Sequence, residues 1–114
     1  MKQTENEIQT IVKELRGGIS GLFAGDDPDV FLFGSYARGN AQEDSDVDVM
    51  LLVDAPRSKI AEKNWQVGDI AADLLLEHGV VVSPIVENRA FFYENASVLP
   101  FFRTIQSEGM RVDG

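Results

Sequence analysis

Apolar residues recur at helical spacing near the start of the chain. The stripe falls at i, i+3, i+4 and i+7, the spacing of one helix face, and consists of Ile8, Ile11, Val12 and Leu15. We expect the Gly17-Gly18 pair to end this helix, because glycine is favoured where helices stop. The alternative is that Ile19 and Leu22 continue the stripe for another turn.

A longer helix is predicted from Ser58, as its N-cap, to Glu77, with His78-Gly79 ending it. Closer to the C-terminus we expect short helices broken near Pro100, the last of them capped by Gly109. The core-facing side of the long helix comprises Ile60, Val67, Ile70, Leu74 and Leu75.

Three short apolar runs, at residues 30–33, 46–53 and 80–86, predict strands. The first is uniformly apolar, which is typical of a strand covered on both faces. A turn at residues 25–29, with Pro28 as its stiff element, precedes it. Strands separated by helices indicate an α/β (α+β) fold, a small mixed β-sheet with helices packed against it, and we expect one domain over residues 1–114.

Composition narrows the classes of function. The chain has no cysteine, which excludes disulfides and thiolate metal sites. Its net charge is −9 and it shows no basic stripe, so we expect nucleic acid not to be the main ligand. A nucleoside triphosphate fits better, because a metal ion bridges carboxylates and phosphates. We find no signal peptide or membrane-spanning stretch and expect a cytoplasmic protein without membrane contact.

Gly34-Ser35 lies where the first predicted strand stops and a short helix starts. Glycine lets the backbone approach a ligand closely, and free N–H groups at a helix start favour phosphate. The Ser35 hydroxyl is able to donate a further hydrogen bond to the same group. Taken alone, a Gly-Ser pair is only a turn.

Asp46 and Asp48 stand at the entry of the second predicted strand. Residues i and i+2 point to the same side of a sheet, with Cα atoms about 6.5–7 Å apart. Two carboxylates so placed are able to share Mg²⁺, and without a cation their charges repel each other. The alternative is an exposed acidic pair at a strand edge.

The joint pattern resembles a known family. The segment from Phe33 to Gly39 (FGSYARG), followed by Ser45-Asp46-Val47-Asp48, resembles the Gly-Ser, ten residues, Asp-x-Asp signature of the polymerase-β-like nucleotidyltransferases. More narrowly, the whole chain is similar to the minimal nucleotidyltransferases, small proteins encoded beside a HEPN-domain partner.

The resemblance implies a role for each matching residue. Gly34 and Ser35 would hold the nucleoside triphosphate, and Asp46 and Asp48 would be the catalytic carboxylates that ligate Mg²⁺. Arg38 would neutralise phosphate, with a salt bridge to Glu43 or Asp44 as the alternative. Tyr36 is interpreted as a packing residue.

One expected feature of the family is missing from the sequence. Many relatives carry a third carboxylate on the following strand, where it completes the metal site. Here that strand reads VVVSPIV, with Ser83 near the position of the third carboxylate and Glu87 beyond the strand's end. Serine is no general base near neutral pH without activation.

Three functions remain open. The first is an antitoxin-like enzyme that transfers AMP from ATP to a hydroxyl of a HEPN-type protein. The second is a non-catalytic nucleotide-binding module that neutralises its partner by contact. The third is an aminoglycoside-type transferase for small molecules, whose acceptor pocket would need a homo-oligomer.

The remaining conspicuous residues are given structural roles. We interpret His78 as a helix C-terminal residue and Trp65 as a packing or interface residue. Four phenylalanines are dense for so short a C-terminal segment, so we expect some of them in the core. Any that is left exposed would mark a partner surface. The four are Phe91, Phe92, Phe101 and Phe102.

Overall fold

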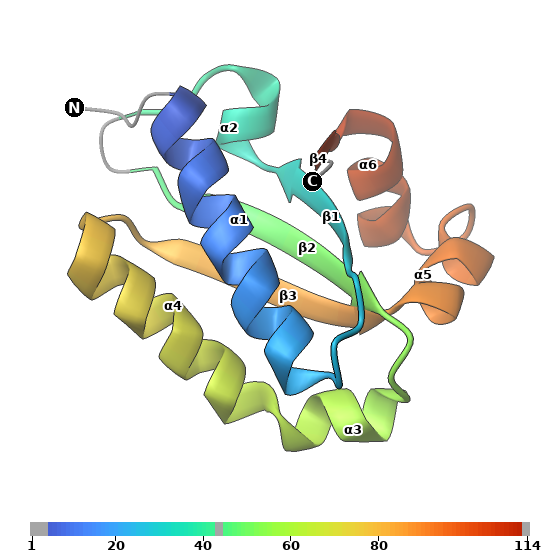
Figure 1. The fold of residues 1–114 in the computed structure, drawn as a ribbon. Helices are drawn as coiled ribbons and strands as arrows, with labels where there is room; N and C mark the ends of the chain where they lie inside the picture. The colour runs from blue at the N-terminus through green and yellow to red at the C-terminus, as the bar shows by residue number, and fades with distance from the viewer. Residues whose placement is uncertain (1–4, 43–44, 113–114) are drawn as a thin grey trace.

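The computed structural model describes residues 5–42 and 45–112, and it forms a mixed sheet with helices on both faces (Figure 1). The helices are α1 (Glu5–Leu22), α2 (Ser35–Arg38), α3 (Arg57–Glu62), α4 (Asn64–His78), α5 (Arg89–Asn95) and α6 (Pro100–Glu108). The strands are β1 (Asp29–Phe33), β2 (Val47–Val53), β3 (Val82–Asn88) and β4 (Met110–Val112).

The sheet has the strand order β3-β2-β1-β4. Strand β1 pairs antiparallel with β2 and β4, whereas β2 and β3 run parallel. This is the small mixed sheet that the sequence predicts. The parallel pair requires a crossover, and α3 and α4 supply it between β2 and β3.

Two apolar cores explain why the central strands do not alternate. Helices α1 and α4 cover one face, and α5 and α6 cover the other (Figure 1). We call these the α1/α4 core and the α5/α6 core. Along β2, alternate residues enter the two cores, so both faces are apolar, as expected for β1 as well. The α1/α4 core takes Val47, Val49, Leu51 and Val53, and the α5/α6 core takes Met50 and Leu52.

The expected end of the first helix at Gly17-Gly18 is wrong. Helix α1 continues to Leu22, in agreement with the alternative, and buries Ile19 completely. Packing gives the reason for one of the two glycines. A Cβ atom on Gly18 would lie 3.1 Å from the side chain of Ile70, so this glycine lets α1 and α4 approach closely.

The single long helix predicted from Ser58 to Glu77 is also wrong. The chain forms α3 and α4, separated at Lys63, whose φ of −96° and ψ of 5° depart from helical values. The first of them is capped by Pro56 in extended conformation and not by Ser58. Leu75 is 44% exposed, because Leu74 occupies the inward position and successive helical residues are rotated by about 100°.

In the C-terminal third, the predicted elements agree more closely with the structure. Pro100 starts α6 at a position where its missing N–H is harmless, and the N–H of Gly109 donates to the Ile105 carbonyl. The third strand begins at residue 82, two residues later than expected. Strand β4 is not predicted, because its three residues are too short for a period-2 pattern. No helix among the described residues is long and apolar enough to cross a membrane.

Arg89 ties the turn before β1 to the end of β2. Its guanidinium donates to the carboxylates of Asp29 and Asp54 and to the backbone carbonyls of Asp27 and Leu52. Burial lowers the pKa of Arg89, but the hydrogen bond to Asp54 and the neighbouring carboxylate charges together outweigh it and raise that pKa above its ordinary value. This hub anchors the ends of β1 and β2 that lie opposite to Gly34 and Asp48.

The two adjacent glycines of α1 should respond in opposite directions to substitution. A methyl group at Gly17 would meet no atom within 4 Å, so Gly17→Ala should stabilise the protein by about 0.5–1 kcal/mol through helix propensity. Gly18→Leu should destabilise it, since the side chain meets Ile70. Urea unfolding of both variants measures this, and equal effects at the two positions would contradict the packing of α1 on α4.

Candidate functional site

The antiparallel pairing of β1 with β2 brings the two motifs together. Phe33, the last residue of β1, pairs with Asp48, and Gly34 follows directly. Gly34 has a φ of 74° and a ψ of −150°, a conformation that is essentially restricted to glycine. A Cβ atom there would lie 3.2 Å from Asp48 Cγ and would overlap a carboxylate oxygen. Gly34 is therefore required both by its backbone conformation and by the approach of Asp48.

Ser35 begins α2, a single helical turn. The Gly34 carbonyl accepts from Arg38 N at 3.1 Å, and the Ser35 carbonyl accepts from Asn40 N at 3.1 Å. Gly39, with a φ of 74°, ends the turn in the left-handed conformation. The backbone after Gly34 is thus folded back tightly beside the start of β2.

The other two residues of the first motif lie on different sides of this turn. Tyr36 packs against the α1/α4 core, which confirms its interpretation as a packing residue. Arg38 is exposed, and its charge acts on Asp48 by lowering the pKa of that carboxyl. The alternative partners Glu43 and Asp44 lie outside the described residues.

Asp46 and Asp48 flank Val47 at the beginning of β2. Val47 is buried in the α1/α4 core, so the alternation of the strand directs Asp48 to the opposite face. Asp46 immediately precedes the strand and is exposed, whereas Asp48 is half-buried. Burial and then the Asp46 charge raise the pKa of Asp48 above its ordinary value of 3.8, while the Arg38 charge opposes them.

These shifts have a chemical meaning. A carboxylate that is partly desolvated and faces a like charge is disfavoured as an anion unless a cation joins it. Asp46 and Asp48 supply the hard oxygen ligands that Mg²⁺ prefers. The donor set and its electrostatics therefore fit a divalent cation.

Ser83 and Glu87, the two residues considered for the third carboxylate, lie at different places along β3. In the parallel pairing of β2 with β3, Ser83 stands directly opposite Asp48, as the sequence indicated. Glu87 pairs with Leu52, four residues farther along the strands and about 13 Å away. Its buried carboxylate already accepts from Arg57 Nε at 3.2 Å and from Asn88 N at 2.7 Å. Glu87 is not a ligand in the same site as Asp48.

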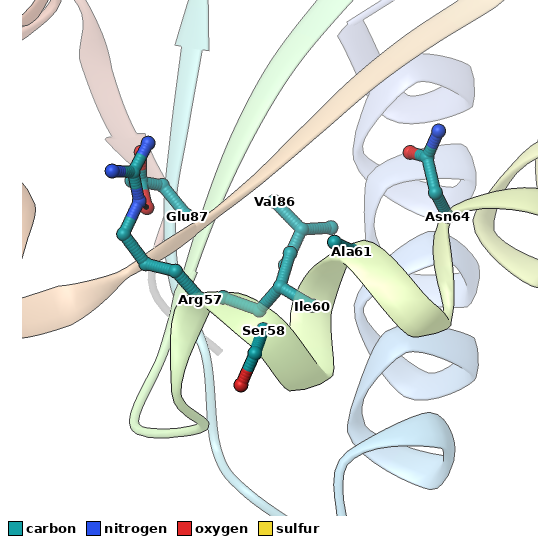
Figure 2. Close-up of a pocket in the computed structure, with 7 residues that line it drawn as sticks. All are labelled: Arg57, Ser58, Ile60, Ala61, Asn64, Val86 and Glu87. Atoms are coloured by element: carbon teal, nitrogen blue, oxygen red, sulfur yellow. Dashed lines mark hydrogen bonds and ion pairs between the residues drawn. The ribbon is translucent and has the colours of Figure 1, made fainter.

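A pocket of about 550 Å³ lies at this far end of the sheet (Figure 2). Figure 2 shows the Arg57 and Glu87 side chains next to each other on one wall of the pocket. Because Glu87 is separated from Asp48 along β3, the pocket is distinct from the Gly34–Asp48 region. Its lining consists of Arg57, Ser58, Ile60, Ala61, Asn64, Val86 and Glu87.

Sequence reasoning missed an aromatic pair beside the site. Phe33, the pairing partner of Asp48, makes an edge-to-face contact with Phe101 of α6 at 5.7 Å between ring centroids. Phe101 is 46% exposed, whereas Phe92 and Phe102 are buried in the α5/α6 core. The density of phenylalanines near the C-terminus was the signal for Phe101, but only the register of β1 places its partner Phe33 next to Asp48.

His78 and Trp65 both belong to α4. His78 Nε2 is 2.7 Å from Glu14 Oε2 of α1, and this hydrogen bond raises the pKa of His78. The carboxylates of Glu14 and Glu77 and the His78 ring form an exposed cluster of three groups. Trp65 is 69% exposed and takes no part in the core.

Comparison with known proteins places this geometry in context. Residues 7–101 match the protein family that is described as "Nucleotidyltransferase domain". Two proteins of Methanocaldococcus jannaschii, each named "putative protein adenylyltransferase", are similar along most of the chain. One is 32% identical over 86% of this chain and 90% of its own length. The other is 35% identical over 93% of this chain and 99% of its own length.

A solved structure shares the fold. The crystal structure of a "putative nucleotidyltransferase" from Sulfolobus solfataricus superposes with a TM-score of 0.55, covering 97% of this chain and 87% of that one, at 15% sequence identity. The family match spans β1, α2, β2 and β3, the elements that bring Gly34 and Asp48 together. The chain belongs to the nucleotidyltransferase domain family.

Proposed function

We propose that this protein binds Mg-ATP between Gly34-Ser35 and the Asp46/Asp48 pair and transfers AMP to a hydroxyl of a partner protein. The observation that carries the proposal is the contact of the Gly34 backbone with the Asp48 carboxylate, which unites a phosphate-binding turn with a metal-binding pair. The family membership supports nucleotidyl transfer as the reaction class.

Each residue has a distinct task in this proposal. The backbone N–H group and hydroxyl of Ser35 bind phosphate oxygens, which the absence of a side chain at Gly34 allows to come close. Arg38, exposed beside Asp48, adds positive charge for the triphosphate. Asp46 and Asp48 would hold Mg²⁺, which supplies charge neutralisation of the phosphates and a lower pKa of the acceptor hydroxyl.

The transfer itself forms one bond and breaks one. The acceptor oxygen attacks the α-phosphorus in line, the bond from that phosphorus to the bridging oxygen breaks, and pyrophosphate leaves. The hydroxyl proton passes to solvent water, because Ser83 stands opposite Asp48 on β3 and is no general base. We therefore expect slow turnover.

Names of relatives support a protein as the acceptor. The two M. jannaschii proteins named for protein adenylylation match this chain over 90% and 99% of their own lengths, so the similarity covers nearly all of both. A HEPN-type protein as the acceptor, with this chain as its antitoxin, follows from the resemblance of the motif to minimal nucleotidyltransferases.

A second candidate function is favoured by Ser83. With two carboxylates instead of three, the chain would bind nucleotide without turnover and neutralise its partner by contact. The two candidates differ in one respect that can be measured, the covalent attachment of AMP.

The first prediction concerns that adduct. Incubation with Mg²⁺, ATP and the neighbouring gene product should add one or more AMP units to the partner, because in the proposed reaction a hydroxyl of the partner attacks the α-phosphorus of ATP. Intact-mass spectrometry detects the adduct, and Asp46→Asn or Asp48→Asn should abolish it. Glu94→Gln, on the exposed side of α5 and outside the motif, is the control and should leave it unchanged. A tight complex without any adduct would instead support the contact function.

The second prediction uses the raised pKa of Asp48. Because the pKa of the Asp48 carboxyl is higher in the folded protein than in the unfolded chain, the folded state favours its protonated form. The free energy of unfolding therefore falls as the pH rises from 3.8 through the pKa of the folded state. In EDTA, Asp48→Asn should therefore be more stable than the wild type at pH 7. That advantage should shrink as the pH falls toward 3.8.

Urea unfolding in EDTA and in Mg²⁺ measures the free energy of unfolding of the wild type and of Asp48→Asn at each pH. Added Mg²⁺ should stabilise the wild type, because a cation compensates the repulsion between Asp46 and Asp48, and should not stabilise Asp48→Asn. A wild type that is more stable than Asp48→Asn in EDTA at pH 7 would contradict the electrostatic account of the site.

A further inference from the structure

The outward face of α4 carries large apolar side chains in water. Leu76 is 85% exposed, Trp65 69% and Leu75 44%. With the exposed Ala72 they lie on one side of the helix, opposite to the buried Val67 and Leu74. The stripe from Trp65 to Leu76 covers twelve residues, and its two ends lie about 16 Å apart along the helix axis. We call these residues the α4 apolar stripe.

This stripe is not part of either core. Figure 1 shows α4 along the outside of the molecule, with α1 and the sheet on its inner side. Val67 and Leu74 enter the α1/α4 core, and Ile70 meets Gly18 of α1. Exposed apolar area of this length on one helix is typical of a surface that another protein covers.

One flank of the stripe is acidic. Asp69, Asp73 and Glu77 are all exposed and follow one another at i, i+4 and i+8 beside the apolar residues. They add to a chain whose net charge is −9. A partner that covers the stripe meets these three carboxylates at its rim.

We propose that the α4 apolar stripe docks an amphipathic helix of a partner protein, apolar on its contact face and rich in Lys or Arg along one flank. A helix of three to four turns matches the length of the stripe and would occupy it as helices do in apolar grooves. The basic flank pairs with Asp69, Asp73 and Glu77, which supplies orientation and faster association.

A second copy of this chain fits the stripe less well. It would bring the same three acids and a further net charge of −9 to the interface. Pairing of a partner's strand with β3, an edge strand of the sheet, is also disfavoured, because Pro84 in β3 has no N–H to donate. The charges select a basic helix.

The location links docking to the proposed function, on which this step rests. After α4 the chain turns at Gly79 and reaches Val81, which is 48% exposed and accepts from Val47 N at 2.9 Å. Asp46 is the next residue before Val47. A helix that ends near the C-terminal end of α4 therefore holds its protein beside Asp46 and Asp48.

The test uses Trp65 as an internal probe, because it is the only tryptophan of the chain. A synthetic helical peptide of Leu and Lys in amphipathic spacing, without tryptophan, is titrated into the full chain. Trp65 emission should shift to the blue as the ring leaves water, and added salt should weaken binding. The matched Leu/Glu peptide should cause no shift.

Two substitutions distinguish the stripe from general charge attraction. Leu76→Asp adds a negative charge, yet it should weaken binding of the Leu/Lys peptide by at least about tenfold, because an apolar anchor is lost. Val98→Asp, at a position 66% exposed between α5 and α6, adds the same charge elsewhere and should bind as the wild type does.

The contrary outcomes are equally definite. Peptide binding without a shift of Trp65 emission, equal affinity of Leu76→Asp and the wild type, or a wild-type dimer that Leu76→Asp dissociates would each overturn the proposal, the last in favour of a second copy. Mg-ATP binding is measured on the same samples. If the peptide binds but Mg-ATP does not, the nucleotide site alone is refuted. If Mg-ATP binds but the peptide does not, the docking surface alone is refuted.

Discussion

The structure depends on one close approach, that of the Gly34 backbone to the carboxylate of Asp48. The antiparallel register sets Phe33 opposite Asp48, and the positive φ of Gly34 turns the chain away from the sheet at that point. Any side chain at position 34 would occupy the space of the carboxylate. The Gly34-Ser35 turn and the Asp46/Asp48 pair thus share one boundary, although Asp46 lies twelve positions after Gly34 in the sequence.

The two cores keep that boundary fixed. Val47 and Val49 are anchored in the α1/α4 core and Met50 in the α5/α6 core, so β2 has little freedom to slide against its neighbours. Asp48 stands between them on the face where Phe33 and Ser83 are its cross-strand neighbours. Rigidity of this kind favours a site that is formed before the nucleotide arrives.

Much of this arrangement could be predicted from the sequence, and the failures have physical reasons. Strands β1, β2 and β3 and the Gly-Ser turn follow local patterns that tertiary contacts do not override, whereas the expectation for Ser83 came from the resemblance to the family. The passage of α1 through Gly17-Gly18 was only the alternative in the sequence, because the close approach of Gly18 to Ile70 involves another helix. Phe101 reaches Phe33 only through the docking of α6, which no local pattern encodes. The outward position of Leu75 likewise depends on where α3 ends and α4 begins.

The most direct test of the central contact compares two glycines that share a φ of 74°. Gly34→Ala places a methyl group against Asp48 and on a backbone whose ψ of −150° suits only glycine, whereas Gly39→Ala adds one with no atom within 4 Å on a left-handed backbone with a ψ of 17°. Isothermal titration calorimetry with Mg-ATP should show binding to the wild type and to Gly39→Ala, and at least about tenfold weaker binding to Gly34→Ala. Equal affinity of folded Gly34→Ala and the wild type would contradict the account.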